Sequence, residues 1–343
     1  MKKENKPIII WLLSGCLLIF LMVVIGGITR LTHSGLSITE WKPIMGTIPP
    51  ISDADWQDVF TKYQQTPEFQ KINYDMKIDE FKFIFFWEFI HRLIGRLIGV
   101  VFIIPFIYFM IKKRLDKQLI QRSLFLFLMG GLQGTIGWYM VYSGLIKDPH
   151  VSHYRLALHL ITAFITFGFT LWFALDLIYP SNGSTKGSVS SLYQMSRALL
   201  AIVIVQIVYG AFVAGLHAGK SYNTFPKMND EWISSAITSM EPYWRNLTEN
   251  QAGVQFIHRC IAWLLVVLIG YFWYLSKKFP LSKRQNTAVN MIVVVLVYQF
   301  LLGVFTLLYA VPITLGVLHQ MGAFFLFSAS VFLVHQMKHR VAA

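Results

Sequence analysis

The sequence predicts an all-α membrane protein, with eight transmembrane helices arranged as two pseudo-symmetric four-helix bundles. Three observations support this fold class. Hydrophobic residues make up 55% of the 343 residues and charged residues only 14%, whereas soluble domains carry about 25% charged residues. The apolar residues are concentrated in long blocks. Short motifs of the first half recur in the second half in the same order, as is typical of internally duplicated membrane proteins.

Eight apolar blocks are long enough to cross the hydrocarbon core of a bilayer, about 30 Å thick, as helices. The expected spans are residues 8–29, 83–111, 119–142, 154–179, 195–216, 254–275, 288–310 and 312–336. The first block follows a basic N-terminus, as a signal peptide would. Its apolar run is too long for a signal peptide and no small-residue cleavage site follows, so we interpret it as an uncleaved span.

The distribution of basic residues predicts the orientation of the spans. The formal net charge is +13, and short basic gaps such as residues 112–122 and 277–284 all lie on one side of the expected spans. Cytoplasmic loops are enriched in Lys and Arg, so both termini are predicted to be cytoplasmic. No Arg- and Ser-rich transit peptide is present, which favours a bacterial inner membrane. Because the charge lies in gaps between spans, the lipid bilayer rather than nucleic acid is the expected partner.

The spans divide into two predicted halves, residues 1–187 and 188–343, which are related by sequence. GGITRLTHSGLS at 26–37 aligns with GAFVAGLHAGKS at 210–221, EFIHR at 88–92 with QFIHR at 255–259, and HLITAF at 159–164 with HQMGAF at 319–324. Halves with an even number of spans are parallel repeats, related by an axis along the membrane normal. Each half has a long outer loop, 30–82 and 217–253, expected to form a structured cap.

Four histidines lie at similar depth within the expected spans: His91, His159, His258 and His319. A buried imidazole in lipid is costly unless it is bonded, and two imidazoles on neighbouring helices form an axial ligand pair for haem. A single intramembrane histidine is often a hydrogen-bonded packing residue. Four of them in repeat-related pairs favour haem iron. Zinc is a weaker alternative, because the sites lack cysteine and have at most one carboxylate nearby.

One carboxylate, Glu88, lies in the outer half of a span, one helical turn before His91. Its repeat partner is the neutral Gln255, so only one of the two sites is equipped for proton or water chemistry. The alternative is that Glu88 is a structural partner for a nearby arginine. Arg92, Arg259 and Arg96 are also embedded, and either haem propionates or Glu88 could neutralise them; the sequence leaves this choice open.

The remaining histidines, Asp176, the two cysteines and a group of glycines are not expected to carry the chemistry, although His33 and His217 are repeat-related and could lie at the haem edge. His33, His150, His153, His217, His335 and His339 are interpreted as solvated or interfacial, and Asp176 as solvated. Cys16 and Cys260 fall within apolar spans, so a loop disulfide is not expected. A group of small residues, Gly130, Gly131, Gly134 and Gly137, fits close helix packing within the chain or in a homo-oligomer.

Several long runs resemble the haem A synthase family. They are GGITRLTHSGLSITEWKPIMGTIPP, DEFKFIFFWEFIHRLIGRLIG, GWYMVYSGL, VSHYRLALHL, YNTFPKM, VQFIHR and TLLYAVPITLGVLHQ, which together extend from about residue 26 to residue 325. The resemblance implies that haem O is the substrate. Its methyl group at C8 would be oxidised to a formyl group, through a hydroxymethyl intermediate, to give haem A for haem-copper terminal oxidases.

The resemblance also assigns roles to residues of this chain. It implies that His91 and His159 bind the substrate haem, that His258 and His319 bind a haem b, and that Glu88 is the catalytic carboxylate. Two positions depart from the family pattern. The chain has no cysteine pair in the outer loops, which is similar to the proteobacterial and mitochondrial branch. Lys227 stands where a leucine is expected.

Two other functions fit the histidines. The first is a di-haem b-type protein that only transfers electrons, and the second is a haem-handling assembly factor or transporter. Neither explains why Glu88 is paired with the neutral Gln255. The expected partners are haem O, the enzyme that produces haem O, and an unidentified electron acceptor.

Overall fold

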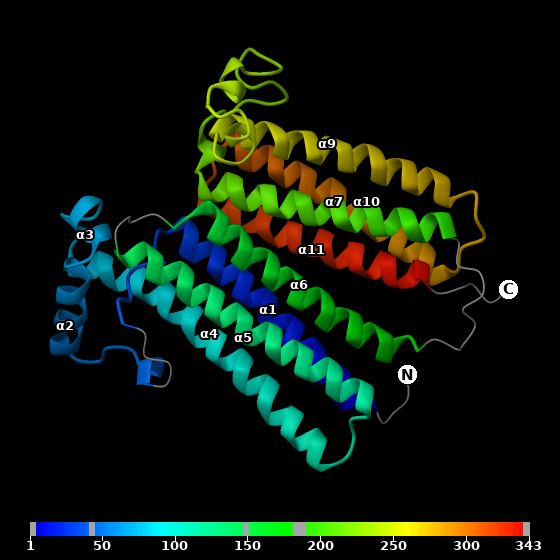
Figure 1. Ribbon diagram of the computed structural model, residues 1–343, viewed down its shortest axis with the longest axis horizontal. Helices are drawn as coiled ribbons and strands as arrows, with labels where there is room; N and C mark the ends of the chain where they lie inside the picture. The colour runs from blue at the N-terminus through cyan, green and yellow to red at the C-terminus, as the bar shows by residue number, and fades with distance from the viewer. Residues whose placement is uncertain (1–4, 41–44, 147–150, 181–189, 339–343) are drawn as a thin grey trace. The chain divides into compact units, whose positions relative to one another are not determined.

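The computed structural model describes residues 5–40, 45–146, 151–180 and 190–338. Within these ranges the chain is helical, and the only β-type pairing is an isolated bridge between Met228 and Glu231. The eight long helices (Figure 1) are α1 (Lys6–Leu31), α4 (Ile78–Ile111), α5 (Lys117–Ile146), α6 (His153–Ile178), α7 (Ser190–Gly215), α9 (Gln251–Ser276), α10 (Lys283–Leu308) and α11 (Ile313–Lys338). All eight are long and apolar enough to cross a membrane, which confirms the predicted fold class.

Most of these helices begin earlier than the expected spans because their first turns are polar. α4 begins at Ile78 rather than 83: Asp79 and Glu80 lie in its first turn, and the Glu80 carboxylate accepts a hydrogen bond of 2.8 Å from the Lys77 N–H. α10 begins at Lys283, where Ser282 and Gln285 form a capping box. Acidic side chains and capping groups satisfy the free N–H groups of a helix start, a signal that hydropathy alone does not contain.

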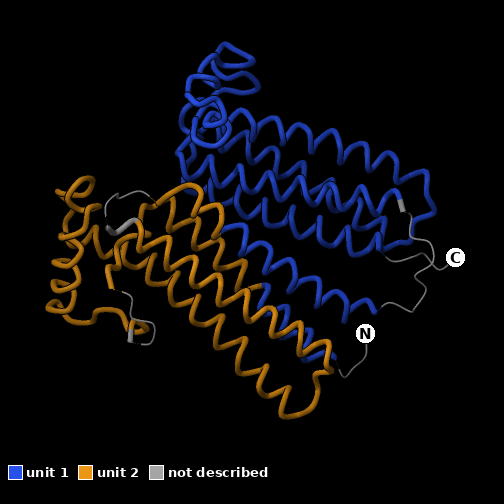
Figure 2. The backbone as a smooth tube through the Cα atoms, viewed as in Figure 1, with its two compact units in different colours: residues 1–16, 160–343 blue, residues 17–159 orange. Residues whose placement is uncertain are grey.

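The chain separates into two compact units (Figure 2). One comprises residues 17–159, and the other residues 1–16 together with 160–343. The unit boundaries fall within α1 and α6, so these units are not the sequence halves 1–187 and 188–343. The division into halves concerns sequence repetition, and with the symmetry of the two bundles it stays a prediction.

In the unit 17–159, the long outer loop forms a folded cap on the beginning of α4. The cap contains the short helices η2 (Met45–Thr47), α2 (Asp53–Gln64) and α3 (Pro67–Lys71). Its apolar core joins Phe60 and Tyr63 of α2 to Phe81, Phe85 and Phe89 of α4, and the Tyr63 and Phe81 rings stack with centroids 5.0 Å apart. The beginning of α4 is therefore fixed by aromatic packing from the cap.

The second outer loop, in the unit that contains α7 and α9, folds around two asparagines. It contains η3 (Ala218–Lys220), η4 (Ser235–Thr238) and α8 (Arg245–Thr248). Asn250 caps α9 by accepting from the Ala252 and Gly253 N–H groups, and its side-chain amide donates to Asn246 over 2.8 Å. Asn246 is buried and also donates to the Met240 carbonyl. The loop is therefore ordered by side chains that replace regular secondary structure.

The helices that precede the two outer loops end in the same way. His33 follows α1 and His217 follows α7, and both adopt a left-handed conformation with φ of 53°. A non-glycine residue in this region is uncommon. Finding it at two positions that align in the sequence supports the proposed relation between the halves.

The structure contradicts one sequence interpretation. His335 was expected to be solvated or interfacial, but it is fully buried, and its Nε2 lies 3.1 Å from Oδ1 of Asp176. The Asp176 side chain, also expected to be solvated, is only 22% exposed. The two residues link α6 to α11, a tertiary contact that periodicity cannot reveal. His33 is exposed, while His153 and His217 are half-buried; His150 and His339 lie outside the described residues.

Candidate functional site

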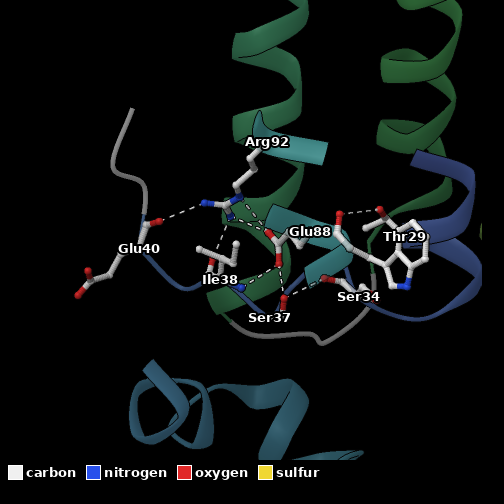
Figure 3. Close-up of polar contacts among 8 residues, drawn as sticks. Thr29, Ser34, Ser37, Ile38, Glu40, Glu88 and Arg92 are labelled. Carbon is white, nitrogen blue, oxygen red and sulfur yellow. Dashed lines mark hydrogen bonds and ion pairs between the residues drawn. The ribbon is translucent and has the colours of Figure 1, made fainter. Parts of the chain in front are cut away.

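Glu88 of α4 is the centre of a buried polar cluster (Figure 3). Its Oε2 accepts hydrogen bonds from the Ser37 hydroxyl at 2.7 Å and the Ile38 N–H at 2.8 Å. Its Oε1 accepts from Nε and one terminal nitrogen of Arg92, at 3.1 and 2.7 Å. A carboxylate has about four acceptor positions. Four donors therefore satisfy the hydrogen-bonding capacity of the Glu88 carboxylate.

Arg92 connects the same cluster to the segment that follows α1. It lies one turn after Glu88, and its guanidinium also donates to the backbone carbonyls of Ile38 at 2.9 Å and Glu40 at 3.1 Å. The pair is well shielded, with the Arg92 side chain 11% exposed and that of Glu88 4% exposed. Glu88, one of the two partners that the sequence left open for Arg92, is therefore an ion-pair partner of Arg92 in the structure.

The repeat-related residues of the other unit form a similar frame with reversed polarity. The Gln255 amide nitrogen donates to the carbonyls of Ala218 at 2.9 Å and Tyr222 at 3.2 Å. Arg259 donates to Gln255 Oε1 at 3.2 Å and to the Tyr222 carbonyl at 2.9 Å. In this unit, the backbone presents acceptors to the glutamine, whereas around Glu88 it presents donors. Each local backbone matches its own side chain, so the Glu-to-Gln difference extends beyond one residue.

Lys227 contributes to this second frame through its backbone. Its carbonyl accepts from Arg259 at 3.1 Å and from the Thr224 hydroxyl at 2.9 Å. Its ammonium group lies outside the frame, 5.7 Å from the centroid of the Trp232 ring. Any residue at 227 could supply the same carbonyl, so this contact does not depend on the lysine side chain.

The four histidines expected to bind iron form two pairs, one in each unit. His91 (α4) and His159 (α6) belong to the unit 17–159, and His258 (α9) and His319 (α11) to the other. All four side chains are half-buried. Each unit therefore contains one of the two histidine pairs that the sequence predicted.

Each of these imidazoles lies against a glycine of a neighbouring helix. A Cβ atom added to Gly137 would lie 2.8 Å from Cε1 of His159, and one added to Gly303 would lie 2.9 Å from Cε1 of His319. The corresponding distances are 3.2 Å from Gly26 to Nε2 of His91 and 3.3 Å from Gly210 to Cε1 of His258. Glycine at these four positions lets the imidazole ring approach the backbone closely.

The residues of the pair His258 and His319 fit a haem. Nδ1 of His258 and Nδ1 of His319 are buried and have no hydrogen-bond partner among the described residues, so each has bonding capacity to spare. Within the described ranges, no group of three or more His, Cys, Asp or Glu side chains could hold a bare metal ion. Two neutral nitrogen ligands with apolar surroundings suit a metal whose other ligands come from a porphyrin.

Comparison with known proteins decides the family. Residues 9–331 match a family model described as "Cytochrome oxidase assembly protein". The chain belongs to this family. The match covers all four histidines, Glu88 and both outer loops, and it confirms the resemblance that the sequence motifs indicated.

Curated relatives match over almost their full length. The chain is 52% identical over 341 residues to the "Heme A synthase" of Flavobacterium johnsoniae, covering 98% of this chain and 99% of that protein. It is 47% identical over 337 residues to that of Nitrosospira multiformis, with coverage of 98% and 95%. It is 41% identical over 333 residues to that of Wolbachia pipientis wMel, with coverage of 96% and 92%.

Sequence reasoning missed several residues of the Glu88 cluster. Ser37 aligns with Ser221 in the repeated motif, but the alignment does not show that its hydroxyl donates to Glu88. The contacts of the Ile38 N–H and the Glu40 carbonyl cannot be predicted from a motif, because a motif specifies side chains and not backbone positions. The common signal was the short polar segment GLSITE directly after α1, which lies in no expected span. Arg96 lies on α4, half-buried, one turn after Arg92.

Proposed function

We propose that this protein is a haem A synthase that oxidises the C8 methyl group of haem O to a formyl group through a hydroxymethyl intermediate. The observation that carries the proposal is the asymmetry of the two histidine pairs. Both pairs have similar glycine contacts, but only the pair His91 and His159 lies in the unit that holds the buried, hydrogen-bonded carboxylate of Glu88. A protein that only carried electrons would need the same histidines in both units and no carboxylate in either.

In this proposal, His91 and His159 hold the substrate haem. The farnesyl chain of haem O favours the lipid phase, so the substrate enters sideways from the bilayer. The glycines opposite the rings, Gly26 and Gly137, keep both imidazoles close to their neighbouring helices. Two ligands fixed in this way orient the porphyrin so that one methyl group is presented consistently.

Glu88 would act through its charge. All four of its acceptor positions are filled by Ser37, Ile38 and Arg92, which leaves no position for an incoming water or proton. Of the two roles open to such a carboxylate, orienting water or stabilising positive charge that develops at the oxidised carbon, this bonding pattern supports the second. Arg92 and Ser37 are positioning residues that hold the carboxylate in place.

We further propose that His258 and His319 hold a haem b. Bound there, it would supply one-electron transfer toward an acceptor that is still to be identified. Arg259 is the best candidate to neutralise a propionate of this haem. Its hydrogen-bond partners are carbonyl and amide oxygens, with no carboxylate among the described residues, whereas Arg92 already pairs with Glu88. Arg96 stays a candidate for the same role in the substrate half.

The proposal extends to the surroundings of the enzyme. The expected setting is a bacterial inner membrane with both termini in the cytoplasm, and haem A would be supplied to haem-copper oxidases. Gly130, Gly131 and Gly134 of α5 have no atom within 4 Å of an added Cβ. This open stripe fits close packing against a second copy or against the haem O synthase, which makes the substrate.

The test is haem extraction and mass analysis from a host that makes haem O but not haem A, with and without this protein. New haem A or its hydroxymethyl precursor is the expected result. If only haem O is recovered and the protein still binds haem b normally, an electron-transfer protein or a haem-handling assembly factor becomes the better interpretation. His258→Ala should abolish haem b binding; an unchanged haem b content would contradict the site assignment.

A further inference from the structure

A glutamine accompanies the glycine opposite three of the four histidines. Gln133 precedes Gly137 by four residues on α5, and its amide nitrogen donates to the backbone carbonyl of His159 at 2.9 Å. Gln206 precedes Gly210 by four residues on α7 and donates in the same way to the carbonyl of His258 at 3.1 Å. Residues four apart share one helix face. Each of these helices therefore presents a glycine to the ring and an amide to the backbone of the same histidine.

The third glutamine occupies the equivalent position opposite His319. Gln299 precedes Gly303 by four residues on α10. Its side-chain oxygen packs directly on Gly322 of α11, one turn after His319, where no side chain could be accommodated. Both histidines of the proposed haem b site thus have a glutamine against their own helix.

The fourth position differs, and it faces His91. Met22 precedes Gly26 by four residues on α1, where Gln206 precedes Gly210 on α7. The Met22 methyl group lies 3.3 Å from the position of an added Cβ at Gly95, one turn after His91 on α4. A thioether has no N–H to donate. The carbonyl of His91 therefore lacks the amide that anchors its repeat partner His258.

The hydrogen bonds from Gln133 and Gln206 to the backbone carbonyls of His159 and His258 are compatible with iron binding, whereas their contacts with the imidazole rings are not. The Gln133 and Gln206 amide nitrogens also approach a ring nitrogen, at 3.2 Å in His159 and 3.4 Å in His258. A neutral imidazole has one unprotonated nitrogen, which cannot both accept from an amide and bind iron. When iron takes that lone pair, the ring contact must be given up, while the bond to the carbonyl continues to fix the helix.

The geometry points to Gln206 and Gln299 as positioning residues for the two permanent ligands of haem b. It points to Gln133 as the positioning residue for His159, the more firmly held ligand of the substrate site, and to His91 as the exchangeable ligand there. This inference rests on the proposed function. A resident haem must keep both ligands, whereas a substrate haem can enter and leave only if at least one ligand yields. The site with a methionine in place of an anchoring amide is the one assigned to the substrate. Glu88 and Arg92 tie α4 to the segment that follows α1, through Ser37, Ile38 and Glu40.

Carbon monoxide tests which ligand yields, because it binds ferrous haem only where an axial ligand leaves. The two sites can be read separately in the purified holoprotein, since the formyl group of haem A shifts its absorption from that of haem b. In the parent protein, the haem of the substrate half should bind carbon monoxide and haem b should resist it. Gln206→Met should raise the carbon monoxide-reactive fraction of haem b by about fivefold, the equivalent of one buried hydrogen bond.

Met22→Gln is the reciprocal variant, and it should lower carbon monoxide binding in the substrate half by about fivefold and increase the haem retained there. A variant that is merely destabilised would change in the opposite direction. Two control variants should bind carbon monoxide as the parent does. Val205→Met places a methionine on a position of α7 that is 45% exposed, and Met22→Leu keeps position 22 apolar. If Gln206→Met and Met22→Gln both retain haem in both halves and bind carbon monoxide as the parent does, this inference is wrong while the proposed function still holds. A protein without haem in either half overturns the proposed function as well.

Discussion

The environments of Glu88 and Gln255 show how duplicated frames can diverge. In both, the side chain lies one turn before an arginine, and the arginine donates to backbone carbonyls beyond the preceding helix. Around Glu88 the backbone and Ser37 supply donors, and around Gln255 the backbone supplies acceptors. A buried charge requires donors at each oxygen, so the negative charge could be kept only where the loop backbone was arranged to match it.

Glu88→Gln breaks this comparison most directly, because it gives the substrate half the side chain of the other half. The amide would place an N–H group against the donors of Arg92 or of Ser37 and Ile38. We expect haem A formation to fall by at least about a hundredfold, as for the loss of other fixed charge-stabilising groups. Haem b content should stay near the parent value. Haem extraction measures both, and normal haem A formation would contradict the charge role.

Gln255→Glu is the reciprocal change. It would place a carboxylate against the carbonyl oxygens of Ala218 and Tyr222, which cannot donate. We expect a lower melting temperature and no second site of haem oxidation. A melting temperature equal to that of the parent would show that the two local backbones are interchangeable after all.

These contacts define how far the sequence could predict the molecule. Hydropathy identified all eight spans, because lipid requires long apolar helices, and the repeated histidines identified both pairs. The donors to Glu88 could not be predicted, since they include a peptide N–H whose position depends on the path of the chain after α1. The contact between His335 and Asp176 was missed for a related reason: the two residues are 159 positions apart and meet only through the packing of α6 on α11.

The glycines opposite the imidazoles offer a second comparison, between positions that face a histidine and positions that do not. Gly137→Ala and Gly303→Ala would each place a methyl group within 3 Å of an imidazole carbon. We expect haem content of the affected half to fall about tenfold, in line with the 1–3 kcal/mol typical of overpacking. Gly131→Ala and Gly270→Ala meet no atom within 4 Å and serve as matched controls. Equal haem content in all four variants would show that Gly137 and Gly303 are not needed for haem binding.

The two arginines that follow Glu88 and Gln255 should respond differently to the loss of charge. Arg259→Gln should lower the retention of haem b by about fivefold, as expected for the loss of one partly exposed charge-assisted bond to a propionate. Arg92→Gln should leave haem b unchanged and instead destabilise the cluster around Glu88, since it leaves a buried carboxylate without its partner. Haem b content after detergent washing separates the two effects. Equal losses of haem b in both variants would contradict the division of roles.

The cap contains a second buried carboxylate, Glu68, which contrasts with Glu88 because it has few donors. Glu68 is 7% exposed, and its Oε2 accepts from the Tyr63 hydroxyl at 3.1 Å. Burial raises the pKa of Glu68 to about 7; the hydrogen bond from Tyr63 opposes this shift and the charge of Glu88 adds to it. An unfolded cap would release this proton near pH 4. The folded cap therefore loses stability as the pH rises from about 4 to 7, and below that window the effect is absent.

Glu68→Gln should remove this pH dependence and stabilise the cap at pH 8 by about 1–3 kcal/mol, because the amide keeps an oxygen for Tyr63 and carries no charge. Limited proteolysis of the cap across pH 5 to 8 measures the effect, with Asp58→Asn as a control, since the Asp58 side chain is 61% exposed. If the parent cap is equally resistant at pH 5 and pH 8, Glu68 is not held in its neutral form. In that case, the cap would need an unrecognised donor for Glu68, and the contrast with the fully satisfied Glu88 would disappear.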